Sequence, residues 1–163
     1  MRPLSLFLLP VFLVPAFCQT DRADLISDKP GLAEAKMAGL VLRADSATLD
    51  RETGELKMRG HVRVTLPARA DHTVVRYGKG VMITQQPIGL TADQVRVKDG
   101  LLEASGNLVL VPADPDLAKV QLRSDEMSMF LRIGDATLRG NIRPSGLPER
   151  GRGSVEFPPE VIK

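Results

Sequence analysis

The sequence predicts an all-β domain of about eight to ten strands, on three observations. A short sequence motif recurs three times. It consists of a small residue and Asp, a strand-like run, a turn, and then Gly with His or Asn before an aliphatic residue. Their Asp-to-Gly separations of 15, 13 and 15 residues differ by an even number, which keeps each side chain on its face of a strand. No stretch has the pattern of a long helix. The copies run from Ala44-Asp45 to Gly60-His61-Val62, from Ala92-Asp93 to Gly106-Asn107-Leu108, and from Ser124-Asp125 to Gly140-Asn141-Ile142.

Residues 1–18 have the pattern of a secretory signal peptide. Arg2 supplies the positive end, residues 4–14 are mostly apolar, and Ala16 and Cys18 form a small-x-small cleavage site before Gln19. The apolar run is shorter than the roughly 20 residues that a membrane-spanning helix needs. We therefore expect an exported, soluble protein from which this segment has been cleaved.

Cys18 is the only cysteine of the chain. It is either a lipid-modified N-terminal residue or a small residue just before the cut, and the bulky Phe17 in front of it favours the second interpretation. The mature chain then has no thiol, which excludes disulfides and cysteine-based metal sites.

Composition argues against several partners. The 163 residues, enough for one domain, carry a formal net charge of +2 with both signs mixed along the chain. One Tyr and no Trp leave little for stacking on bases or sugars. We expect no nucleic-acid binding.

The first repeat unit gives the clearest strand pattern. Residues 19–39 are expected to be a polar lead-in with a short helical piece at 32–37, and the β domain is expected to cover residues 40–143. A turn at 50–54, with Gly54 in its left-handed position, leads into a return strand at 55–66. In that strand Leu56, Met58, Gly60, Val62, Val64 and Leu66 alternate with five polar residues.

Three further hairpins are expected. One is an extra hairpin around Gly78-Lys79-Gly80, and the next turns at Asp99-Gly100, a strong tight-turn signal. The last runs from 120 to 143 and turns at Gly134-Asp135. Residues 144–163, rich in Pro and Gly, are expected to form a flexible tail with an edge strand at 154–157.

Chemically reactive constellations are weak in this sequence. His61 lies between Arg59 and Arg63, two charges that disfavour a protonated or metal-bound imidazole, so we interpret it and His72 as ordinary solvated histidines. The three repeated Asp residues recur for structural reasons. No nucleophile elbow, zinc-protease motif or phosphate loop is present. We expect no enzyme activity, no metal and no cofactor.

The repeated Gly60, Gly106 and Gly140 leave two interpretations open. A glycine inside a strand marks a sharp bend or the close approach of another group. On the structural interpretation they mark a row where the two sheet faces come near each other, on the functional one their missing side chains leave room for a ligand chain, and the two are compatible.

The repeats resemble the OstA-like domain of the LptA family of periplasmic lipopolysaccharide-transport proteins. The resemblance rests on residues 42–50, on Thr53-Gly54-Glu55-Leu56 and on 59–64, with a second copy in 91–94 and 104–108. It covers most of residues 40–143. His61 departs from the family pattern, which usually has Asn at this place.

The resemblance implies an open, twisted β-jelly roll of stacked antiparallel strands in the periplasm. Lipid A acyl chains of lipopolysaccharide would lie in its apolar groove. The strands at its ends would join other jelly rolls of the inner-membrane export complex and the outer-membrane translocon by strand addition, with a head-to-tail homo-oligomer as one form of that bridge.

Alternation along the strands assigns the groove wall to one apolar face. A packed β core is the alternative interpretation for each member of this set. The assigned residues are Leu56, Met58, Val62, Val64, Val95, Val97, Leu102, Leu108, Leu110, Met127, Met129, Leu138 and Ile142.

Other functions remain open beside the bridge protein. An LptC-like component of the same system shares the jelly roll, although that type keeps a membrane anchor. A structural β-repeat module would bind only proteins. A hydrolase of envelope glycans is disfavoured by the lack of a placed nucleophile.

Overall fold

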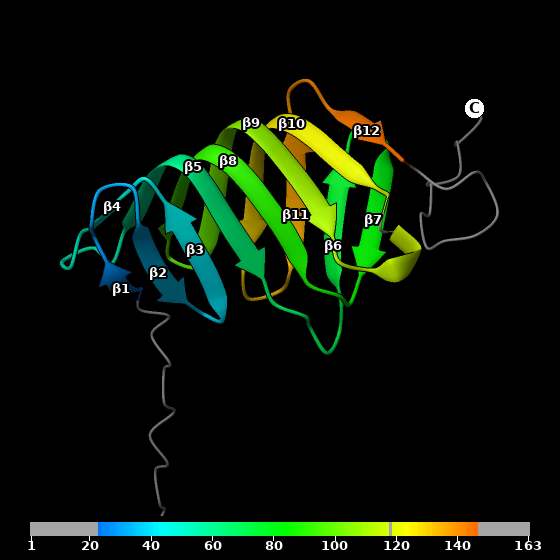
Figure 1. The fold of residues 1–163 in the computed structure, drawn as a ribbon. Helices are drawn as coiled ribbons and strands as arrows, with labels where there is room; N and C mark the ends of the chain where they lie inside the picture. The colour runs from blue at the N-terminus through cyan, green and yellow to red at the C-terminus, as the bar shows by residue number, and fades with distance from the viewer. Residues whose placement is uncertain (1–22, 118, 147–163) are drawn as a thin grey trace, which may run out of the picture.

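The computed structural model describes residues 23–117 and 119–146, which form an all-β, open jelly roll (Figure 1). Ten strands follow one another across a single sheet in the order β1-β2-β3-β5-β8-β9-β10-β11-β6-β7, while β4 pairs with β5 and β12 with β10. All neighbours are antiparallel except β11 and β6. The elements are β1 (Asp24–Ser27), β2 (Ala33–Met37), β3 (Leu40–Ala44), β4 (Ser46–Leu49), β5 (Leu56–Leu66), β6 (Thr73–Tyr77), β7 (Gly80–Thr84), β8 (Ile88–Lys98), β9 (Leu101–Pro112), the 3-10 helix η1 (Pro115–Leu117), β10 (Gln121–Phe130), β11 (Asp135–Arg139) and β12 (Arg143–Ser145).

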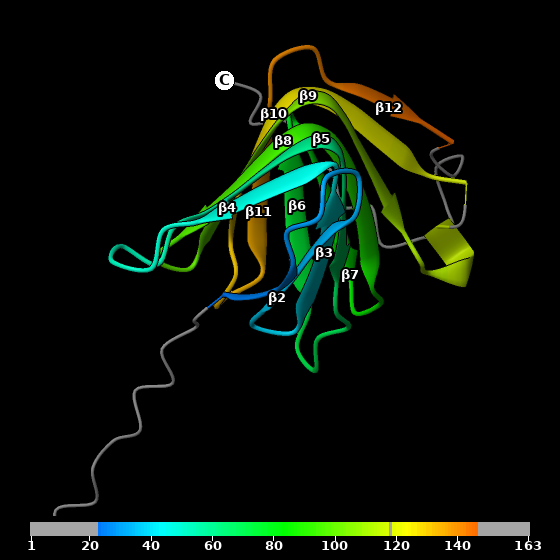
Figure 2. The ribbon, with the colours of Figure 1, turned by 60° about the vertical axis from the view of Figure 1, so that its left-hand side comes forward.

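Four long strands shape the roll. β5, β8, β9 and β10 arch over a common crest and run down on both sides of it (Figures 1 and 2). Along β5 buried and exposed residues alternate, as period-2 patterning requires. The buried side chains of both sides form one apolar core between them. Within the described ranges no helix is long and apolar enough to cross a membrane.

The predicted tight turns are confirmed. Asp99 and Gly100, between β8 and β9, have φ values of 49° and 75°, the two left-handed positions that a two-residue hairpin turn needs. Gly54 has a φ of 70° in the turn before β5. These positions could be predicted because the turn chemistry is local.

The sheet extends beyond residues 40–143 at both ends. The helical piece expected at 32–37 is wrong: β2 occupies Ala33–Met37, and β1 precedes it within the expected lead-in. Ala, Glu, Lys and Met favour helices, but Ala33, Ala35 and Met37 are buried alternately beside β3, and this tertiary packing outweighs the propensity. The signal peptide at 1–18, Cys18 and the edge strand at 154–157 lie outside the described residues.

The end of the last hairpin also differs from the expectation. The return strand expected at 136–143 ends at Arg139, because the chain turns at Gly140, whose φ is 87°. The separate strand β12 then pairs with the start of β10 and carries the sheet to Ser145, inside the segment expected to be a tail.

In the strand order, β9, β10 and β11 separate the β6–β7 hairpin from its sequence neighbours β5 and β8. It joins the end of the sheet through the parallel pairing of β6 with β11. Arg69, in the segment before β6, holds this junction: its guanidinium donates to the Leu131 and Arg132 carbonyl oxygens, both at 2.9 Å. Val74 N–H donates to the Gly134 carbonyl oxygen in the same turn, at 2.8 Å.

Replacing Arg69 with Ala is expected to lower the free energy of unfolding by about 1–2 kcal/mol, because two charge-assisted hydrogen bonds to a partly buried turn are lost. Urea unfolding measures the change. Arg132→Ala, which removes an exposed side chain from the same turn, is the control and is expected to cost less than about 0.5 kcal/mol. Equal losses in the two variants would contradict this role of Arg69.

Candidate functional site

The predicted groove wall lies on the inner face of the roll. Twelve of its thirteen residues are buried, with exposed fractions of 0–3%, so the strand phase of these twelve is as predicted. Ile142 is only partly buried and packs against the edge of the core. The buried members, which β5, β8, β9, β10 and β11 bring together, are Leu56, Met58, Val62, Val64, Val95, Val97, Leu102, Leu108, Leu110, Met127, Met129 and Leu138.

The inner face is predominantly apolar. In the described ranges no charged side chain is buried, and the buried polar residues are Thr73, Thr84 and Ser124. Ser124 Oγ donates to the Glu126 carbonyl oxygen at 3.0 Å, and Thr84 Oγ1 accepts from Gln86 N–H at 3.0 Å, so these two are satisfied locally. Such a surface suits contact with apolar groups.

The charged residues instead lie on the outer face. Arg96 forms ion pairs with Glu55 and, at 2.9 Å, with Glu103. A hollow of about 350 Å³ lies over β5, β8, β9, β10 and β11. Most of its lining faces outward, and the buried Met58, Val95, Ala104 and Met127 complete it. The outward-facing members are Lys57, Arg59, Gln94, Arg96, Glu103, Ser105, Glu126, Ser128 and Arg139. The inner face is filled by its own side chains, so a ligand chain entering it would displace them.

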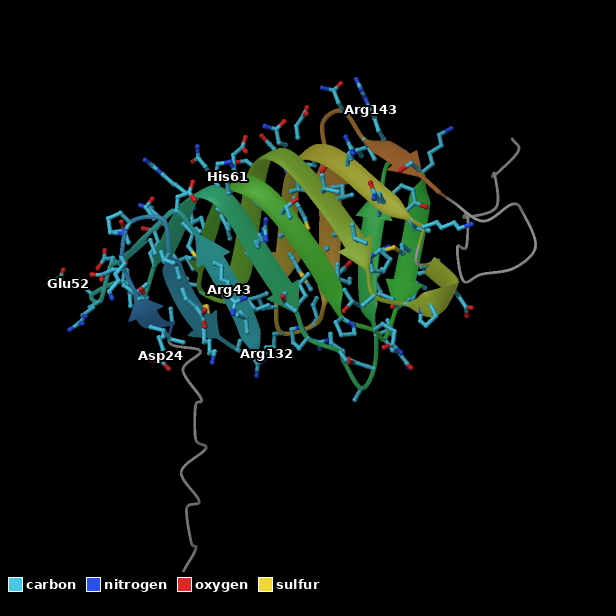
Figure 3. The ribbon with its side chains drawn as sticks, in the orientation of Figure 1. Asp24, Arg43, Glu52, His61, Arg132 and Arg143 are labelled. Carbon is cyan, nitrogen blue, oxygen red and sulfur yellow. The ribbon has the colours of Figure 1, made fainter. Side chains whose placement is uncertain are left out.

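The repeated motif forms the bend of the roll, a row that we call the crease: Gly60-His61, Asp93, Gly106-Asn107 and Asp125. Between β5 and β8 the register shifts so that Gly60 and His61 lie opposite Asp93 alone. Between β9 and β10 it shifts so that Gly106 and Asn107 lie opposite Asp125. Two residues facing one is a β-bulge, which bends strands sharply. Figure 3 shows His61 at the top of the arch.

Each Asp of the repeat binds the Gly-containing pair of its own copy. Asn107 Nδ2 donates to Asp93 Oδ2 at 2.8 Å, and Asn141 donates to Asp125 Oδ2 from its backbone N–H at 3.0 Å and from its side chain at 2.9 Å. The carboxylate lies where a glycine side chain would be: a Cβ on Gly106 would be 2.6 Å from Asp93 Oδ2.

The structural interpretation of the three glycines is therefore corrected: the group that approaches each glycine is the Asp of its own copy, at a bend of the chain, and not the opposite sheet face. The interpretation that their missing side chains make room for a ligand is wrong, because Asp45, Asp93 and Asp125 occupy that space. The joint recurrence of Asp and Gly in the sequence indicates that they belong to one structural unit. It does not reveal that the Asp side chain contacts the glycine.

His61 is exposed, as expected of a solvated histidine, but the expectation that Arg59 and Arg63 disfavour its protonation is wrong. His61 Nδ1 lies 2.7 Å from Asp45 Oδ2. This hydrogen bond and the charge of Asp45 raise the pKa of His61, and the charge of Asp93 adds to the effect, whereas Arg63 opposes it weakly. Arg59 and Arg63 are sequence neighbours, but the carboxylate across the bulge decides the protonation.

We expect nuclear magnetic resonance titration to give His61 a pKa above the unperturbed value of about 6.5. Asp45→Asn is expected to return it toward that value, and Asp93→Asn, the control, to lower it less. Because the folded-state pKa is raised, the stabilisation is complete below the unfolded pKa and is lost as the pH rises through the folded one. An unchanged His61 pKa in Asp45→Asn would contradict this pairing.

One buried polar group escaped the sequence reasoning altogether. Tyr77, on β6, is 5% exposed, and its hydroxyl forms no hydrogen bond with the residues that the structure describes. Its inward direction could have been read from the alternation Thr73, Val75, Tyr77, which are all buried. In the described ranges no group of three His, Cys, Asp or Glu side chains is placed to hold a metal ion.

The chain matches no protein-family model and no curated protein.

Proposed function

We propose that this chain is a periplasmic lipopolysaccharide-binding bridge protein, which shields lipid A acyl chains between the inner and the outer membrane. The observation that supports it best is the composition of the inner face. Among the described residues no charged residue is buried there, and aliphatic side chains and Met line both sides of the crease. Each acyl methylene moved from water to such a surface contributes about 0.8 kcal/mol.

The sheet edges support the bridge role. β1 and β7 end the strand order of the described residues, and Figure 1 shows them at opposite ends of the roll. Ile26 on β1 is 54% exposed. An edge strand can pair with a strand of another chain, so jelly-roll partners or further copies would add at these ends. An LptC-like role in the same system would use the same surfaces.

A second candidate is a structural module that binds only proteins. The observation that favours it is the near-zero exposure of the groove wall, because a well-packed core needs no ligand. Methionines at Met58, Met127 and Met129 favour the bridge instead, since flexible, polarizable side chains adapt to a changing ligand.

Photocrosslinking in cells distinguishes the bridge protein from the structural module. A photoreactive residue is placed at Met58, Leu108 or Met129 on the inner face, and at the exposed Arg63 as the control. The bridge protein predicts lipopolysaccharide adducts at the inner sites alone. Folded, exported protein without adducts at any inner site would reject the bridge in favour of the structural module. The same residue at Ile26 is expected to capture a jelly-roll partner.

A further inference from the structure

In the described part of the chain, Tyr77 Oη is a buried oxygen that has neither a hydrogen-bond partner nor an ion-pair partner. Three buried side-chain atoms there lack a hydrogen bond: Arg69 Nε, Tyr77 Oη and Asp135 Oδ1. Arg69 Nε lies 3.3 Å from Asp71 Oδ1, and Asp135 Oδ1 lies 3.3 Å from Arg76 Nε, so each has an ion-pair partner. Tyr77 Oη has neither. Burying a hydroxyl without a partner costs about 1–3 kcal/mol, so its retention calls for a reason.

The position of the ring indicates where this hydroxyl is used. Tyr77 pairs with Gly80 across the β6–β7 hairpin, and its ring covers that glycine: a Cβ on Gly80 would lie 2.5 Å from Cε2 and 3.0 Å from Oη. The ring therefore reaches from β6 over β7, the last strand of the sheet. The hydroxyl lies on the inner face beside an edge of the open roll.

The hairpin that carries Tyr77 buries both hydroxyl-bearing and apolar side chains, with Thr73 and Thr84 among the first kind. Val75 and Met82, buried on the same hairpin, belong to the core that holds the groove wall. Burial raises the pKa of the Tyr77 phenol, so the group stays protonated at neutral pH and can donate a hydrogen bond.

We propose that Tyr77 Oη is the point at which the inner face recognises an oxygen carried by its lipid, namely a carbonyl or hydroxyl oxygen attached to an acyl chain. The proposal rests on the proposed function, since it needs acyl chains to enter the roll. An apolar groove accepts any alkyl chain, and one donor inside it favours chains that bring an acceptor oxygen. Tyr77 is in this sense a specificity-determining residue.

The test compares two probes in wild-type and Tyr77→Phe protein. Purified lipopolysaccharide carries acyl oxygens, whereas dodecyl maltoside, used below its micelle concentration, has an alkyl chain that carries neither a carbonyl nor a hydroxyl group. Binding is measured by displacement of a neutral apolar dye. Tyr77→Phe is expected to bind lipopolysaccharide about fivefold more weakly, the effect of one hydrogen bond, and dodecyl maltoside as well as wild type does.

Thr73→Val is the matched control. It removes a buried hydroxyl from the same face of the same strand, and it is expected to leave the ratio of the two affinities unchanged. Without lipid, Tyr77→Phe is expected to resist urea at least as well as wild type, because the lost hydroxyl had no partner. A lower urea midpoint would overturn the proposal by revealing a partner within the protein.

The wild-type chain offers a direct readout, because Tyr77 is its only tyrosine and it has no tryptophan. Tyrosine fluorescence therefore reports on this residue alone, and lipopolysaccharide is expected to change it more than dodecyl maltoside does. Equal affinities of wild type and Tyr77→Phe for lipopolysaccharide would overturn the inference and leave the proposed function standing. Binding of neither probe by wild type would overturn both.

Discussion

Replacing Gly106 with Ala is expected to lower the free energy of unfolding by about 2–4 kcal/mol. Gly106 has a φ of 76°, where an L-residue costs about 1–2 kcal/mol more than glycine. The new Cβ would also lie 2.6 Å from Asp93 Oδ2 and 2.9 Å from Asp93 Cβ. Asp93 must move, and the hydrogen bond that it accepts from Asn107 is then lost, at a further cost of about 1 kcal/mol.

Urea unfolding of Gly106→Ala beside Gly100→Ala isolates the clash. Gly100 has nearly the same φ, 75°, but a Cβ there would meet nothing within 4 Å. Gly100→Ala is therefore expected to show the backbone cost alone. If the two variants lose the same stability, the contact between Asp93 and Gly106 does not hold the crease.

Replacing Leu102 with Ala is expected to cost about 2–5 kcal/mol, because the substitution leaves a cavity in the core. Leu102 is fully buried and lies between Val97 of β8 and Met129 of β10. Urea unfolding measures this loss. An apolar cavity can also bind an apolar ligand, so dodecyl maltoside is expected to restore part of the stability.

Leu101→Ala is the control for this core substitution. Leu101 precedes Leu102 in β9 and is only half-buried, because neighbouring residues of a strand point to opposite faces. It is expected to cost less than half as much as Leu102→Ala. A larger loss in Leu101→Ala would mean that the strand phase assigned to β9 is wrong.

The parts of this fold that could be predicted depend on short stretches of chain. Met58 and Val62 were placed on the inner face because alternation within a strand needs no knowledge of the partner strand. The turn at Asp99-Gly100 was recognisable because its two left-handed residues favour Asp and Gly for local reasons. The repeated Asp and Gly pointed to a recurring structural unit.

The parts that could not be predicted depend on contacts between distant residues. Residues 33–37 have helical propensity, but they form β2 because they pair with β3. From the sequence, the neighbouring Arg59 and Arg63 predict that His61 is not protonated. In the structure, Asp45 across the bulge raises the pKa of His61 instead. The unpartnered hydroxyl of Tyr77 is visible only once the core around it has been assembled.

The sequence by itself therefore determined that the chain forms strands, where most of its turns lie, and which side chains face inward, since these follow from backbone conformation and from the two-residue period of a strand. Only the tertiary structure decided the order of strands, with β6 joined in parallel to β11, and the use of each repeated Asp to fill the place of a glycine side chain. The reason is that pairing and bulge geometry depend on residues that the chain brings together from far apart, which no local pattern records.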